Sequence, residues 1–218
     1  MRYFKNRQAA GKLLAKQLKK YKTENCVVLS LSEGGVVVGA EIAKELHTEL
    51  FLLVTEDIDL PGEPDPIAIM SSSGSFTYNS GAYSTGDLEA LSVDYRPIIE
   101  QGKMIAFQKI NRVVSHEGSI MKILLKNHII ILVSDGLRNG FSVDVATDFL
   151  KPINAKGLII AAPVINSSAI DKMRLLSDNI FCLDVVEEYI NTDHYYEDNK
   201  LPSHDEIVMT MKNIVFEW

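Results

Sequence analysis

Five short runs of apolar residues constrain the fold of this chain more than any other feature of its sequence. They lie at 26–31 (CVVLSL), 49–54 (ELFLLV), 128–134 (HIIILVS), 157–164 (GLIIAAPV) and 179–185 (NIFCLDV). Runs that do not alternate between polar and apolar residues are typical of strands buried on both faces of a parallel sheet. Helical patterns at 36–46 and 142–153 lie between such runs, so the sequence predicts an α/β fold with a mostly parallel sheet flanked by helices.

The alternation is interrupted after the second run. Residues 55–66 (TEDIDLPGEPDP) contain three prolines and one glycine and predict a loop. Two short strands around Ser73-Gly74 predict a hairpin, and residues 87–125 look mainly helical, with Pro97 near a helix start and Gly118 near an end. We therefore expect a single domain, 1–218, in which residues 55–125 form a small hood.

Composition excludes several classes of function. The formal net charge of -7 gives no general attraction to nucleic acid or to anionic membranes. No apolar run approaches the roughly 18 residues that span a bilayer, and the amphipathic start does not resemble a signal peptide, so we expect a cytoplasmic protein. Cys26 and Cys182 lie inside apolar runs, where a thiol packs as a small hydrophobe, and the histidines show no metal-ligand spacing. We expect no resident metal and no disulfide.

Two turns at predicted strand ends are candidate binding sites, because ligands of parallel sheets bind beyond the carboxyl ends of the strands. In the turn after the third run, the backbone N–H groups of residues 139–142 open a helix and can converge on a phosphate. Gly136 and Gly140 permit positive φ angles and close approach, and Asp135 can accept hydrogen bonds from sugar hydroxyls. An ordinary turn, in which the glycines serve only the backbone, is an equally good interpretation of this motif alone.

The motif has a counterpart in a known family. The apolar run, acid, glycine, aliphatic residue, second glycine and final hydroxyl of residues 129–142 resemble the diphosphoribosyl (PRPP) signature of type I phosphoribosyltransferases. Further segments resemble, in order and spacing, a bacterial subgroup of predicted phosphoribosyltransferases. These segments are 4–18, 27–46, 60–66, 158–164 and 194–207.

The resemblance implies an enzyme that transfers phosphoribosyl from PRPP to a base-like acceptor and uses Mg²⁺. By this resemblance, Asp135 is the catalytic residue that holds the ribose, and a second loop at Glu33, Gly34 and Gly35 holds pyrophosphate. Members of the family often form homodimers. The resemblance places the 5-phosphate in a cradle formed by Gly136, Leu137, Arg138, Asn139, Gly140, Phe141 and Ser142.

The sequence departs from the family pattern mainly where the pattern has cations. Glu33 stands in place of an arginine, and Glu56 and Asp57 stand in place of an Arg-Lys pair. Two like charges about 4 Å apart repel by about 4 kcal/mol at an effective dielectric constant near 20, so these acids oppose pyrophosphate binding.

Within the signature loop, Ser134 replaces the first of two adjacent acids, while Asn139 and Ser142 replace threonines. The phosphate cradle is thus better preserved than the pyrophosphate loop. Two hypotheses follow: a phosphoribosyltransferase, or a catalytically inactive protein of the same fold that binds a phosphate-bearing small molecule such as PRPP or a nucleotide monophosphate.

Overall fold

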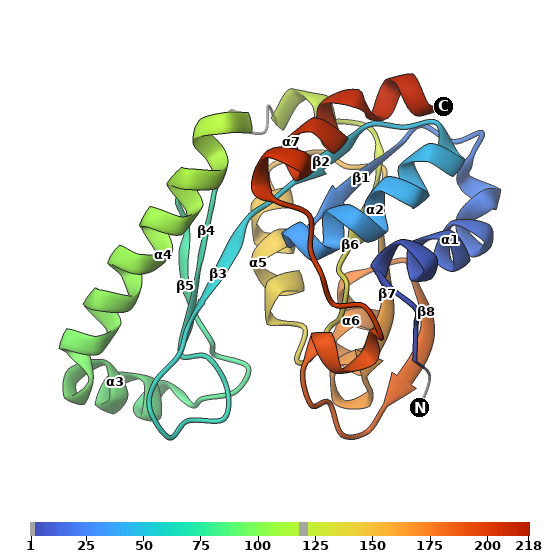
Figure 1. The fold of residues 1–218 in the computed structure, drawn as a ribbon. Coiled ribbons are helices and arrows are strands. Elements are labelled where there is room, and N and C mark those ends of the chain that lie inside the picture. The colour runs from blue at the N-terminus through green and yellow to red at the C-terminus, as the bar shows by residue number, and fades with distance from the viewer. Residues whose placement is uncertain (1–2, 118–121) are drawn as a thin grey trace. The chain divides into compact units, whose positions relative to one another are not determined.

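The computed structural model describes residues 3–117 and 122–218, which form two compact units (Figure 1). One unit combines the residues up to Leu53 with those from Lys122 onward. The other comprises the residues from Val54 to Glu117. Within the described ranges, no helix is both long and apolar enough to cross a bilayer.

The first unit is built on a five-stranded sheet in which every pairing is parallel. The strand order is β2-β1-β6-β7-β8, and the sheet confirms the predicted fold class. Each strand comes from one of the five apolar runs. The strands are β1 (Cys26–Ser30), β2 (Leu50–Leu52), β6 (Ile129–Val133), β7 (Gly157–Asn166) and β8 (Asn179–Val186).

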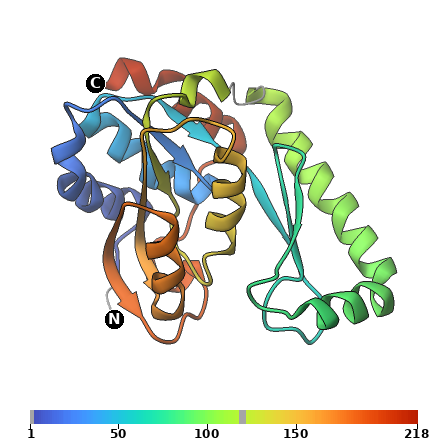
Figure 2. The same ribbon diagram turned by 180° about the vertical axis from the view of Figure 1, so that it is seen from behind.

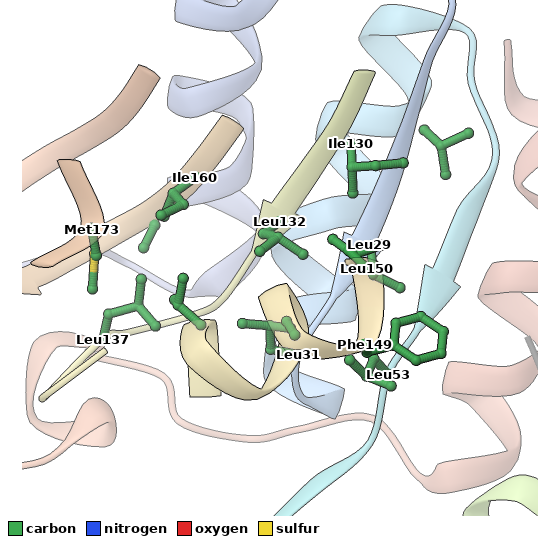
Figure 3. Close-up of a cluster of buried hydrophobic side chains, with 14 of the residues drawn as sticks. Leu29, Leu31, Leu53, Ile130, Leu132, Leu137, Phe149, Leu150, Ile160 and Met173 are labelled. Atoms are coloured by element: carbon green, nitrogen blue, oxygen red, sulfur yellow. The ribbon is translucent and has the colours of Figure 1, made fainter. Parts of the chain in front are cut away.

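Helices cover both faces of this sheet. Figures 1 and 2 show α1 (Arg7–Leu18), α2 (Glu33–Leu46) and α7 (His204–Asn213) on one face and α5 (Phe141–Leu150) and α6 (Ser167–Leu176) on the other. Leu29, Leu132 and Ile160 of the strands pack with Phe149 and Met173 of α5 and α6 in the core between them (Figure 3). Short 3₁₀ helices are η1 (Lys19–Tyr21), η2 (Lys122–Leu125), η3 (Thr192–Tyr195) and η4 (Ile214–Glu217).

The second unit is a three-stranded antiparallel sheet with two helices. The sheet order is β3 (Thr55–Ile58), β4 (Ala68–Ser71) and β5 (Phe76–Tyr78), and the helices are α3 (Thr85–Asp94) and α4 (Arg96–Glu117). The predicted hairpin is present, with Gly74 at φ 85° between β4 and β5. Gly118, the expected helix end, lies outside the described residues.

The prediction of a loop over residues 55–66 is wrong at its start. Residues 55–58 pair with β4 as strand β3, and Ile58 is buried in a cluster with Ile67 and Ile99. Burial of Ile58 therefore anchors strand β3. Its acidic residues Glu56 and Asp57 are the reason that the sequence pattern predicted a loop. Whether this unit acts as a hood stays a prediction.

Candidate functional site

The signature loop begins as an extension of the sheet. The Leu137 N–H donates to the Val164 carbonyl oxygen at 3.0 Å, and the Asn166 N–H donates to the Leu137 carbonyl oxygen at 2.9 Å. The Leu137 side chain is buried in the core shown in Figure 3. Leu137, predicted to belong to the cradle, therefore uses both of its backbone polar groups in pairing with β7.

The cradle proper lies at the amino end of α5. Gly140 is the N-cap at φ 72°, a left-handed conformation that favours glycine, and the nearest side-chain atom would be 3.4 Å from an added Cβ. The Phe141 N–H, one of the predicted phosphate donors, already donates to the Asn139 side-chain oxygen at 3.1 Å. Within the described part of the chain, the half-buried Ser142 makes no side-chain hydrogen bond. Its hydroxyl is therefore available to an anion.

Asp135 does not extend into the cradle. Its carboxylate accepts a hydrogen bond on each oxygen: Arg7 Nε donates to Oδ2 at 2.7 Å, and Ser32 Oγ donates to Oδ1 at 2.9 Å. The Asp135 side chain is 11% exposed. It lies against the first turn of α2, where a Cβ on Gly34 would come within 2.0 Å of Oδ2. Asp135, the residue predicted to hold the ribose, is thus bound instead by Arg7 and Ser32 of the same chain.

Arg7 is the residue that organises this arrangement. Its side chain, 5% exposed, also donates from Nη2 to Asp193 Oδ1 at 2.5 Å, and its guanidinium lies 4.6 Å from the centre of the Tyr196 ring. Burial would lower the pKa of Arg7, but the charge of Asp135 and the hydrogen bonds to Asp193 and Asp135 outweigh burial and raise that pKa. Arg7 is therefore a permanent buried cation that bridges two carboxylates.

The sequence analysis did not identify Arg7, although a signal was present. Arg7 lies on the buried face of α1, at the i, i+3, i+4, i+7 spacing of an apolar stripe. A charged residue on such a stripe needs a partner, because an uncompensated buried charge is costly. The other buried members of this face are Ala10, Gly11, Leu14, Ala15 and Leu18.

The segment Tyr189–Tyr196, here called the tail strap, covers the start of the signature loop. The Tyr196 hydroxyl donates to the Asp135 carbonyl oxygen at 2.5 Å. A Cβ added at Gly136 would lie 2.1 Å from the Tyr189 hydroxyl oxygen and 3.0 Å from Thr192. Gly136 is not among the glycines with positive φ, so close approach of the tail strap is what requires glycine there.

The tail strap is firmly anchored. The Phe4 N–H donates to the Tyr195 carbonyl oxygen at 2.9 Å, and Tyr195 and Tyr196 are buried in a core cluster with Phe4. Burial raises the pKa values of Tyr189 and Tyr196 far above the usual range, so both hydroxyls stay neutral at physiological pH. The tyrosine pair at 195–196 therefore packs as core.

The predicted pyrophosphate loop is a helical turn. We expected a loop before a helix at 36–46, but α2 begins at Glu33, because the Ser32 side chain caps it by accepting the Gly35 N–H at 2.9 Å. Glu33 Oε1 lies 2.7 Å from His204 Nδ1 of α7. The acid that replaces the family's arginine is thus part of the packing of α7 on α2. In the other unit, Glu56 pairs with Lys109 at 2.8 Å.

The residues present do not form a magnesium site of their own. Across residues 3–117 and 122–218, no group of three or more histidine, cysteine, aspartate or glutamate side chains could hold a metal ion. Asp135 accepts hydrogen bonds from Arg7 and Ser32, and its side chain is 11% exposed. The second unit contains a hollow of about 380 Å³. It is lined by Tyr78, Ser92, Val93, Arg96, Ile99 and Glu100.

Comparison with solved structures shows a similar fold. A protein from Thermus thermophilus, TT1426, superposes with a TM-score of 0.71 at 22% sequence identity, covering 97% of this chain and 98% of that one. At this level of identity the likeness shows the fold alone.

Comparison by sequence gives the family. Two Mycobacterium tuberculosis proteins are each 25% identical to this chain over 209 residues. They are MT0597 of strain CDC 1551 and Rv0571c of strain H37Rv, and both have provisional phosphoribosyl transferase names. The matches cover 95% of this chain but 46% of each relative, so the chain spans about half the length of these relatives. The family model described as the phosphoribosyl transferase domain matches residues 3–197. The chain therefore belongs to the phosphoribosyl transferase domain family.

Proposed function

We propose that this protein binds the phosphate group of ribose 5-phosphate or of a nucleoside monophosphate at residues 138–142, and that it lacks a working pyrophosphate site. The observation that carries the proposal is the contrast between the amino ends of two helices. At α5, Gly140 opens the helix, the Ser142 hydroxyl is available, and the acid of the first turn, Asp144, comes only at the fourth position and pairs with Lys172. At α2 the first residue is the acid Glu33. A helix amino end stabilises an anion, and a carboxylate placed there competes with that anion.

The second candidate function is transfer of phosphoribosyl from PRPP to a base-like acceptor. Membership of the family favours it. That reaction builds up negative charge on the departing pyrophosphate, which must be stabilised as it forms. Glu33 supplies charge of the wrong sign for this purpose, so we rank transfer below simple phosphate binding.

Calorimetric titration of the purified protein separates the two candidates. We expect ribose 5-phosphate and AMP to bind with similar affinity, and PRPP with Mg²⁺ to bind no more tightly than ribose 5-phosphate. PRPP affinity at least tenfold higher than that of ribose 5-phosphate would demonstrate a pyrophosphate site and favour the transferase.

A matched pair of variants tests the location of the site. Ser142→Ala removes the hydroxyl at the second position of α5. We expect this change to lower the affinity for ribose 5-phosphate about tenfold, which is the effect of losing one hydrogen bond to a charged group. Ser168→Ala makes the same change at the second position of α6 and should leave affinity unchanged. Equal affinity in the wild type and both variants would place the ligand elsewhere, and absence of binding by all phosphates would refute the proposal.

Charge reversal tests the reason for the missing pyrophosphate site. Glu33→Arg restores the family's cation at the first position of α2, and Glu56→Arg with Asp57→Lys restores the other two cations. We expect PRPP affinity to rise in the triple variant while ribose 5-phosphate affinity stays constant. Unchanged PRPP affinity would show that these acids are not the obstacle.

A further inference from the structure

The signature loop has no free carboxylate for a sugar. Asp135 is the only acid among residues 134–142. One of its oxygens receives the Arg7 hydrogen bond and the other receives the Ser32 hydrogen bond. A carboxylate can accept about four hydrogen bonds, so the restriction comes mainly from access: the Asp135 side chain is 11% exposed.

The tail strap limits that access from the side of Gly136. The Tyr189 hydroxyl lies over Gly136 and bonds with the Thr192 hydroxyl at 2.8 Å. The neighbouring Ser134 cannot substitute for the missing acid, because its hydroxyl donates to the Gly136 carbonyl oxygen at 2.8 Å. Both positions of the family's acid pair are therefore used within the protein.

From these contacts we infer that Ser32 and Tyr189 are specificity-determining residues that make the site indifferent to ribose hydroxyls. The site then selects phosphate monoesters by the phosphate group and not by the sugar. This inference rests on the proposed function, since it describes what the phosphate site selects. Ser32 occupies Oδ1 and Tyr189 covers the approach along Gly136, while Arg7 holds the carboxylate in place through Oδ2.

The test compares AMP with 2′,3′-dideoxy-AMP, which lacks both ribose hydroxyls. In the wild type we expect affinities within twofold of each other. The double variant Ser32→Gly/Tyr189→Ala frees Oδ1 and opens its approach, while the Arg7–Asp135 pair remains and glycine preserves a favourable N-cap for α2. In this variant we expect AMP to bind at least fivefold more tightly than the dideoxy compound.

Two controls sharpen the result. Tyr3→Ala removes an exposed tyrosine that contacts the tail strap at His194, and it should keep the wild-type ratio. Adding Asp135→Asn to the double variant should return the ratio toward one, because the charge-assisted hydrogen bond is lost. A wild-type ratio above fivefold, or an unchanged ratio in a folded double variant, would overturn the inference.

Carbodiimide labelling of carboxylates, read by mass spectrometry, reports the shielding without any ligand. We expect Asp135 to be unmodified in the wild type and modified in the double variant. If AMP fails to bind the wild type, the proposed function fails, and labelling still decides the shielding: modification of wild-type Asp135 overturns it, whereas modification only in the double variant upholds it.

Discussion

Replacing Arg7 by methionine should destabilise the first unit severely, because it leaves Asp135 buried without its counter-charge. The two side chains are 5% and 11% exposed, so both are largely desolvated. Removing one partner of such a pair costs about 3–5 kcal/mol, out of a total stability of about 5–15 kcal/mol for a typical domain. For a protein of this size, that loss corresponds to a decrease of roughly 6–20 °C in Tm.

Urea unfolding followed by the fluorescence of Trp218, the only tryptophan in the sequence, measures this loss, since Trp218 belongs to the first unit. Asp193→Asn removes the other carboxylate of the Arg7 bridge, but Asp193 is 62% exposed, so it should cost less than about 1 kcal/mol. The double variant Arg7→Met/Asp135→Asn should be more stable than Arg7→Met alone. A loss below about 1 kcal/mol in Arg7→Met, or additive losses in the double variant, would refute the reasoning.

Three further outcomes follow from the structure. Gly140→Ala should cost about 1–2 kcal/mol in urea unfolding, because φ 72° is strained for alanine, although the space is open. Gly136→Ala should be destabilising because its methyl group would overlap the Tyr189 hydroxyl, and Tyr189→Phe should recover part of the loss. Burial raises the pKa of Cys182 to about 11, so at pH 8 its iodoacetamide alkylation should be roughly 100-fold slower than that of a thiol with pKa 9 and should speed up as pH rises. Rates near those of the unfolded chain would contradict this last expectation.

The parallel sheet is predictable from the sequence because each of its strands coincides with a short apolar run of neighbouring residues. Strands buried on both faces are largely apolar, as in β1, β6 and β7. The edge strand β8 is mostly half-buried and carries Asp184, but its apolar run still lies within one residue of the observed bounds. β3 escapes this reasoning, because a short strand outside the main sheet can carry exposed acids and still pair with its neighbour. The predicted start of α2 was also wrong. Gly34 and Gly35 suggest a loop, but the hydrogen bond that the Ser32 side chain accepts from the Gly35 N–H starts the helix at Glu33.

The candidate site was predictable only in part. The sequence indicates the turn and the left-handed Gly140, since these depend on neighbouring residues. The phosphate cradle stays a prediction. It does not indicate that Asp135 is occupied, because its partner Arg7 lies 128 residues away and no local pattern links the two. Nor does it indicate that Tyr189, rather than a ligand, approaches Gly136. A single sequence does not show which side chains far apart in the chain contact each other in the fold.

The bridge made by Arg7 also bears on how the chain folds during synthesis. Arg7 and Asp135, its buried partner, are separated by 128 residues. At translation rates of about 5–20 residues per second, Asp135 is made roughly 6–26 s after Arg7. Helix α1 therefore emerges from the ribosome with the Arg7 guanidinium on its apolar face before the carboxylate that pairs with it has been made. Productive docking of α1 should thus wait for Asp135, and a nascent chain stalled before Asp135 should remain open to proteases at α1.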